Sequence, residues 1–345
     1  MLYKEYIGIK SIIVHEVGNK LNQENILFSK KTLSISKEME NVLINHFLLP
    51  FKSNEYFNFF HEIDINMNEV FVCISKIFKD EKTLQEQSVN LAKHLYEQST
   101  HPQIKSGEFY TVYFKDCIID GETVDAIGLF KSENKDTFLK VFSSGEGFEI
   151  ETIQGNNINK LDKGCLIFNI EKEKGYIVSV VDNTSKGNNA LYWIDDFLHI
   201  RQRKDEYHNT QNILSLCKNF AQKELPQQFD VTKAEQVDFL DKSIKFFKEK
   251  ENFKMNEFTN EVIGNPEIIE RFNQYSSSFQ KDYDIEITDN FSISDSAVKK
   301  QNRLIKKVIK LDKNFDIYIH GNSELLEQGE DKKGKYYKVY YNNES

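Results

Sequence analysis

The stretch from residue 107 to residue 182 constrains the fold most, because it reads as a series of short strands separated by turn residues. Its β-rich segments are, in chain order, EFYTVYFKDCII, DGETVDAIGLFKS, DTFLKVFS, GFEIETI, GCLIFNIE and GYIVSVVDN. Asp120-Gly121 separates the first two segments and suits a tight hairpin turn, because glycine tolerates positive φ. Strands joined by such short turns pair antiparallel, so the sequence predicts an antiparallel sheet here.

Helical patterns lie on both sides of this stretch. In the segment 35–49, apolar residues recur at helical spacing, Ser34 or Ser36 can cap the start, and Pro50 ends the pattern. Further helices are expected at 68–79 and 82–99 before the sheet, and at about 190–200 and 207–223 after it. Two strands, 6–14 and 24–28, precede all of them. The two later helices are expected to cover one face of the sheet.

The pattern becomes mainly helical after residue 225. LPQQFD at 225–230 is the best candidate for a linker, and helices are expected at 233–250, 255–262 and 266–280. YDIEIT at 283–288 reads as a short strand, and NFDIYIH, ELLEQGED and KYYKVYY read as a small three-stranded sheet. The sequence therefore predicts an α+β protein with two domains, a helix-covered sheet domain at 1–224 and a mostly helical module at 225–345.

Composition supports a folded protein in a reducing compartment. A chain of 345 residues exceeds the usual size of one domain, and an aromatic fraction of 13% supplies core material. The four cysteines lie far apart and form no C-x-x-C pair, which favours buried thiols in a cytosolic protein. The N-terminus has no apolar signal-peptide region, and no apolar run approaches 18 residues, so no membrane span is expected.

The most unusual charge feature is VKKQNRLIKKVIK at 298–310. It holds six basic side chains and no acidic one, whereas the whole chain has a formal net charge of −9. Ordinary exposed helices mix the two signs. The segment is therefore either a solvated helix face or a surface that meets an anionic partner.

A helical wheel over residues 297–313 separates two faces. Apolar side chains from Ala297 to Leu311 fall within an arc of roughly 160°. The cations lie on the opposite side of the helix. The apolar side is therefore expected to pack on a core, while the opposite side carries a row of basic side chains. A row of cations spaced by one helix turn can follow a phosphate backbone for a few phosphates. The candidate DNA contacts here are Lys299, Lys300, Arg303, Lys306, Lys307 and Lys310.

A second basic cluster, RQRK, follows the candidate helix at 190–200. Arg201, Arg203 and Lys204 could complement the dipole at the C-terminus of that helix, or they could contact phosphate. Both interpretations stay open from the residues alone.

Patterns that would indicate an enzyme are absent or incomplete. Asp195, Asp196 and His199 lie close together but supply too few ligands for a metal site. Glu133-Asn134-Lys135 matches half of a nuclease signature, but it lies in an expected turn. No nucleotide-binding glycine loop and no nucleophile motif occurs. We therefore expect no catalytic residues, no metal and no cofactor.

The order of features resembles the bacterial nucleoid-associated protein family of the NdpA type. The similar segments are IIVHEV near the start, KLDKGCLIF, VSVVDN, ALYWIDDFLHI and NTQNILSLCKNFA in the middle, and FDIYIHGNSELLEQG near the end. The resemblance spans nearly the whole chain. It implies a cytoplasmic, nucleoid-localised, DNA-associated protein, and it transfers no catalytic residues.

These observations together predict a protein that binds double-stranded DNA largely without sequence specificity, through backbone phosphates. A homodimer is a hypothesis, because two linked basic faces would raise the avidity for a polyanion. The alternatives are an adaptor that recruits a DNA-processing protein partner, which the acidic net charge favours, and a metal-dependent nuclease or defence effector.

Overall fold

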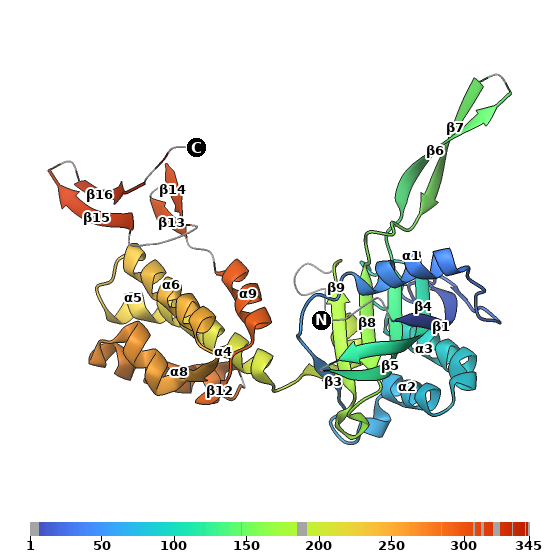
Figure 1. Cartoon of the computed structure of the whole chain (residues 1–345), viewed down its shortest axis with the longest axis horizontal. Helices are drawn as coiled ribbons and strands as arrows, with labels where there is room; N and C mark the ends of the chain where they lie inside the picture. Colours follow the sequence, from blue (N-terminus) through green and yellow to red (C-terminus); the bar gives the residue numbers. More distant parts are fainter. Residues whose placement is uncertain are drawn as a thin grey trace. The chain divides into compact units, whose positions relative to one another are not determined.

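The computed structural model describes residues 7–119, 121–145, 147–184, 192–283, 285–305, 308–311, 314–319, 325–332, 334–341 and 343. It forms two compact units, Met1–Arg203 and Lys204–Ser345 (Figure 1). The sequence predicted the boundary at residue 224. The boundary lies earlier because helix α4 (Glu206–Asn219) buries Ile213 and Leu214 in the core of the second unit.

The first unit is built on an eight-stranded antiparallel sheet with the order β10-β3-β9-β8-β5-β4-β1-β2. Its strands are β1 (Gly8–Val17), β2 (Ile26–Leu27), β3 (Phe57–Phe59), β4 (Gly107–Ile119), β5 (Glu122–Ser132), β8 (Lys163–Phe168), β9 (Ile177–Asp182) and β10 (Ile200–Gln202). The long middle strands are the ones that the alternating segments and turns predicted. The predicted α+β class with a helix-covered antiparallel sheet is confirmed.

Helices cover both faces of this sheet. Helix α1 (Lys37–Leu48) packs on one face, and α2 (Glu69–Lys79) and α3 (Leu84–Gln98) pack on the other. Strand β8 shows the consequence, because Cys165 lies in the cluster beneath α2 and α3 while Leu166 lies in the cluster beneath α1. A strand buried on both faces reads as an unbroken apolar run rather than as an alternation.

Short elements complete the first unit. They are η2 (Ile65–Met67), η3 (Glu81–Thr83), η4 (Lys172–Lys174) and the π-helix η6 (Tyr192–Leu198). The last corresponds to the helix expected at about 190–200, and it packs with α2 and α3 on one face of the sheet. Strands β6 (Asp136–Ser144) and β7 (Gly147–Gly155) leave the sheet and pair only with each other, as a projecting ribbon in Figure 1.

The second unit is a helical body with short ribbons. Its helical elements after α4 are η7 (Phe220–Glu224), α5 (Leu225–Gln228), α6 (Lys233–Glu249), α7 (Met255–Phe258), η8 (Thr259–Ile263), α8 (Pro266–Tyr283) and α9 (Asp295–Leu304). Buried phenylalanines such as Phe220, Phe247 and Phe272 fill its core. The helices predicted at 233–250, 255–262 and 266–280 are confirmed. The predicted linker at 225–230 is mostly the short helix α5.

The strands of the second unit differ from the prediction. They are β11 (Asn252–Lys254), β12 (Asn290–Ser292), β13 (Val308–Leu311), β14 (Phe315–Tyr318), β15 (Leu326–Asp331) and β16 (Gly334–Val339). The expected three-stranded terminal sheet is replaced by two separate ribbons, β13–β14 and β15–β16. Within YDIEIT, Tyr283 ends α8 and residues 285–288 form no strand, because the backbone N–H groups of Ile285 and Ile287 donate to Gln280 instead of to a neighbouring strand.

The four cysteines are all buried and reduced. Burial raises the pKa of the Cys73 thiol to about 11 and that of Cys217 to about 12, so both stay protonated and unreactive near neutral pH. This agrees with the prediction of buried thiols. Within the described residues, no helix is both long enough and apolar enough to cross a bilayer.

His15 on β1 gives the first unit a dependence on pH. Its Nδ1 accepts the N–H of Ser29 at 3.0 Å, and its Nε2 lies 2.9 Å from the Ser88 hydroxyl, which itself donates to a backbone carbonyl. These contacts require the neutral ring protonated on Nε2. Burial lowers the pKa of His15 below its ordinary value near 6.5.

We expect the free energy of unfolding to fall as the pH drops from about 7 to 5. The folded state resists protonation of His15 while the unfolded chain accepts the proton, so acid favours unfolding. Losing the Ser29 hydrogen bond costs about 1–3 kcal/mol. Urea denaturation at both pH values measures this change in the free energy of unfolding.

The variant His15→Asn is the control. Asparagine keeps an acceptor that does not titrate in this range, so the free energy of unfolding should depend less on pH. Burial also lowers the pKa of His46 and His208, which leaves a residual slope. An unchanged slope in the variant would contradict the assignment.

Candidate nucleic-acid interface

The basic segment forms a helix and then a strand, not one continuous helix. Ser294 caps α9 by accepting the N–H of Ala297, and the helix ends at Leu304. Ile305 is already extended, and Val308–Leu311 pairs with β14. The helix predicted over 297–313 is therefore wrong at Ile305 and at Val308–Leu311, the residues beyond Leu304 that the structure describes. β-Branched residues such as Val308 and Ile309 suit a strand, and pairing with β14 decided the outcome.

The structure divides the six predicted contacts of this segment into three groups. Lys299, Lys300 and Arg303 are exposed on α9, whose Ala297 and Val298 are buried. Lys310 is exposed on β13. Lys306 and Lys307 lie outside the described residues. The sequence predicted one row of cations along a single helix. The structure places the described cations of this segment on two successive elements, α9 and β13.

These two elements help to form a groove of about 870 Å³ within the second unit. Helix α6 supplies one wall, α9 supplies another, and the β13–β14 ribbon completes it. The lining residues are Gln222, Lys233, Gln236, Val237, Leu240, Lys248, Asn302, Arg303, Ile305, Val308, Lys310, Tyr318 and Ile319. Among the described residues, the groove lining therefore holds four cationic side chains and no carboxylate.

The cations of this groove form no ion pair within the described residues, although the acidic Asp316 lies opposite Lys310 in the β13–β14 pairing. Among the described residues, Lys248, Arg303 and Lys310 form no ion pair, and Lys233 donates to the amide oxygen of Gln236 at 2.9 Å. Elsewhere on α6, Lys242 is paired with Asp238 at 2.7 Å. Unpaired cations in a concave surface give a positive potential that attracts polyanions.

Sequence reasoning missed Lys233 and Lys248. Both come from α6, where acidic and basic residues mix and no charge run stands out. They lie almost at opposite ends of that helix, and only the packing of α9 and β13 beside α6 brings them to one surface with Arg303 and Lys310. No local signal in the sequence indicates this arrangement.

The RQRK cluster lies elsewhere. Arg201, on strand β10, stacks on the ring of Phe60 and lies 3.8 Å from a carboxylate oxygen of Glu62. Arg203 lies 3.4 Å from Glu171. Lys204 is exposed at the start of the second unit. Because Arg201 and Arg203 face carboxylates of the first unit, they are weaker candidates for phosphate contacts than the groove cations.

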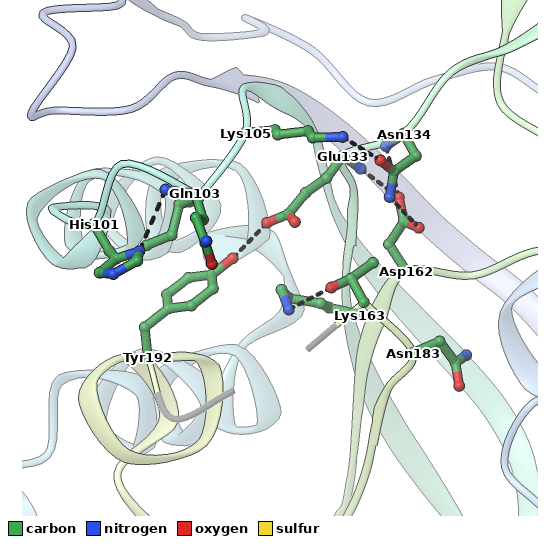
Figure 2. A pocket seen from close by; sticks show the side chains of 11 residues that line it. His101, Gln103, Lys105, Glu133, Asn134, Asp162, Lys163, Asn183 and Tyr192 are labelled. Carbon is green, nitrogen blue, oxygen red and sulfur yellow. Dashed lines mark hydrogen bonds between the residues drawn. The ribbon is translucent and has the colours of Figure 1, made fainter. Parts of the chain in front are cut away.

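A second concavity, of about 460 Å³, lies in the first unit and has a mostly polar lining (Figure 2). Tyr192 points from η6 toward Glu133 and donates to its carboxylate at 2.6 Å. The buried Lys163 ammonium donates to both oxygens of Asp182 at 2.8–2.9 Å and to the Thr184 hydroxyl. The first contact joins η6 to the residue after β5, and the second joins β8 to β9. The Lys163 ammonium also lies 5.1 Å from the centre of the Tyr192 ring, which brings the two pairs together.

The polar groups of this concavity satisfy one another. Asp162 accepts the backbone N–H groups of Glu133 and Asn134 at 2.6 and 2.8 Å. Lys131, fully buried behind the concavity, pairs with Glu133 at 3.2 Å, and burial lowers the pKa of this lysine. Burial also raises the pKa of Tyr192 well above its ordinary value, so the phenol remains a donor. We interpret the network as a structural clamp.

The nuclease half-signature fits this interpretation. Glu133 is engaged by Tyr192 and Lys131, whereas Lys135 donates to Glu108 and Asn156. Within the described residues, no group of three metal-ligating side chains is placed to hold an ion. The fold therefore separates the two residues that a nuclease would use together.

Comparison with known families assigns the class of the protein. The family model described as nucleoid-associated protein YejK matches residues 13–343, which include nearly all of both units. The match makes the chain a nucleoid-associated protein, as the resemblance to the NdpA-type family implied. The chain belongs to the family described as nucleoid-associated protein YejK. No curated protein matches it.

Proposed function

We propose that the chain binds double-stranded DNA largely without sequence specificity, through the cationic groove of the second unit. The observation that carries the proposal is a concave surface whose described lining residues include four cations and no carboxylate, in a protein whose net charge is −9. Lys233, Lys248, Arg303 and Lys310 contact backbone phosphates in this proposal. Phosphate contacts position a protein on DNA but carry no sequence information.

The remaining basic residues are additional candidates for phosphate contacts in this proposal. Lys299 and Lys300 extend the positive surface along α9, and Lys306 and Lys307 stay candidates because they connect α9 to β13 in the sequence. Arg201, Arg203 and Lys204 are kept as weaker candidates. A homodimer would bring two grooves to one DNA and raise the avidity. Localisation to the bacterial nucleoid in the cytoplasm follows from DNA association.

A salt titration of DNA binding tests the proposal. If the four groove cations contact phosphates, the slope of log affinity against log salt is about −3 to −4, which corresponds to a loss of roughly 100-fold between 50 and 200 mM salt. Fluorescence anisotropy with two unrelated duplexes of equal length measures the slope and the sequence tolerance together. We expect equal slopes and affinities for the two duplexes.

The adaptor alternative gives a different result. An adaptor that recruits a DNA-processing partner needs no phosphate contacts, so purified protein would show no binding at low salt, or a flat response to salt. Either outcome would overturn the proposal of direct DNA binding.

A further inference from the structure

The β6–β7 ribbon exposes a large apolar surface that no described residue covers. Leu139, Val141, Phe148 and Ile150 are exposed by 67%, 56%, 79% and 65%. The strands pair over nine residues, from Asp136 with Gly155 to Ser144 with Gly147. A two-stranded ribbon without further packing is marginally stable in water. Large apolar side chains on such a ribbon therefore indicate a surface that is covered by a partner.

The pairing register separates the ribbon into two different faces. Successive side chains on a strand point to opposite faces, and paired residues share a face. The uncharged face holds Thr137, Leu139, Val141, Ser143, Phe148, Ile150, Thr152 and Gln154. The other face, called the charged face, holds all the ionisable side chains of the two strands, namely Asp136, Lys140, Glu149 and Glu151.

Contacts within the ribbon preserve this separation. On the charged face, Lys140 pairs with Glu151 at 2.7 Å and lies over the ring of Phe142. At the base, Asp136 accepts from Asn157 and Lys160 at 2.7 and 2.9 Å. These contacts fix the ribbon's register, in which Phe138, Phe142 and Ile153 share the charged face. A one-residue slip would move Leu139, Val141, Phe148 and Ile150 off the uncharged face.

We propose that the uncharged face is a self-association surface, on which a second copy of the chain docks its own ribbon face to face. The face carries no ionisable group, so two copies meet without like-charge repulsion. The charged face carries three carboxylates and one lysine, which disfavours an acidic partner such as nucleic acid. A twofold contact between identical faces closes on itself and gives a dimer rather than a fibre.

The size of the face indicates a reversible dimer. Nine residues at about 3.4 Å each give a ribbon roughly 30 Å long, and two strands make it roughly 10 Å wide. Face-to-face contact then buries about 600–1,000 Å² in total, which is below the roughly 1,200–2,000 Å² of stable complexes. Dimerisation should therefore depend on concentration. The proposal names the surface of the homodimer included in the proposed function, and it holds whether or not the groove binds DNA.

Sedimentation velocity on the full chain without DNA, from about 1 to 200 µM, tests the proposal. We expect a monomer–dimer equilibrium that salt does not weaken, because apolar contacts hold the dimer. Val141→Glu/Ile150→Glu, at the centre of the uncharged face, should raise the dissociation constant at least tenfold. Phe138→Glu/Phe142→Glu, on the charged face, adds the same charge and should change it less than threefold.

A second experiment, in which two variants of opposite charge are mixed, shows whether a loss of dimer comes from charge repulsion or from a misfolded ribbon. Val141→Lys and Val141→Glu variants should each be monomeric, while their equimolar mixture should recover the dimer through opposite charges across the interface. A wild-type chain that stays monomeric at 200 µM would overturn the proposal and leave another protein as the partner of the ribbon. A dimer equally weakened by both Glu pairs would also overturn it. DNA binding by the monomeric variants, measured separately, reports on the groove alone.

Discussion

Replacement of Lys233, Lys248, Arg303 and Lys310 by glutamate is expected to abolish DNA retention at 100 mM salt. The four side chains line one groove, and none of its described lining residues is a carboxylate, so reversing their charge converts an attractive surface into a repulsive one. Removing four phosphate contacts alone lowers the affinity by roughly 100-fold or more, and it removes the salt dependence. Anisotropy titrations of the wild type and the variant at three salt concentrations measure both effects.

A matched control separates the groove from the general effect of negative charge. Lys242, Lys245, Lys281 and Lys335 are exposed in the same unit and are absent from the groove lining. Their replacement by glutamate makes the same change in net charge. We expect a loss of affinity below about fivefold, because surface charges distant from the bound phosphates are screened by salt. Equal losses in both variants would show that DNA is not held in the groove.

The second large effect is expected from Asp182→Ala in the first unit. Lys163 is 1% exposed, and its ammonium depends on Asp182 for two of its contacts. Removing one partner of a buried ion pair leaves an uncompensated charge and costs about 3–5 kcal/mol. Urea denaturation at pH 7 measures the loss of unfolding free energy.

Two further variants make this expectation specific. Lys163→Met/Asp182→Leu removes both charges, so it should recover most of the stability that Asp182→Ala loses. Asp136→Ala breaks an exposed pair with Lys160 and should cost less than about 1 kcal/mol. If Asp182→Ala were as mild as Asp136→Ala, the clamp interpretation of the polar network would be wrong. DNA affinity should stay unchanged in every folded variant, because the network lies outside the groove.

Local patterns in the sequence predicted most elements of the fold. Alternation and the Asp-Gly turn predicted the pairing of β4 with β5, and helical spacing predicted α1 to within a few residues at each end. Local patterns could not predict that β6 and β7 leave the sheet. Their alternation is the same as that of a sheet strand. Only the direct pairing of β5 with β8 shows that β6 and β7 are not part of the sheet.

The candidate groove was only partly predictable for the same reason. The acid-free run drew attention to Arg303 and Lys310, because charge composition is a property of neighbouring residues in the chain. The end of α9 at Leu304 could not be read from that run, since the spacing of Ile305, Val308 and Ile309 suits a helix face as well as a turn into a strand. Pairing with β14 selected the strand.

The sequence by itself determined the α+β class, most of the helices, the long middle strands of the sheet, the buried cysteines and the presence of one concentrated basic segment. These features depend on residues within a few positions of each other, where the periods of helix and strand apply. Tertiary structure alone decided that α4 joins the second unit, that α6 contributes Lys233 and Lys248 to the groove, and that the β6–β7 ribbon presents an uncharged face. Those outcomes depend on packing between segments that are distant along the chain, and no local period encodes which segments will meet.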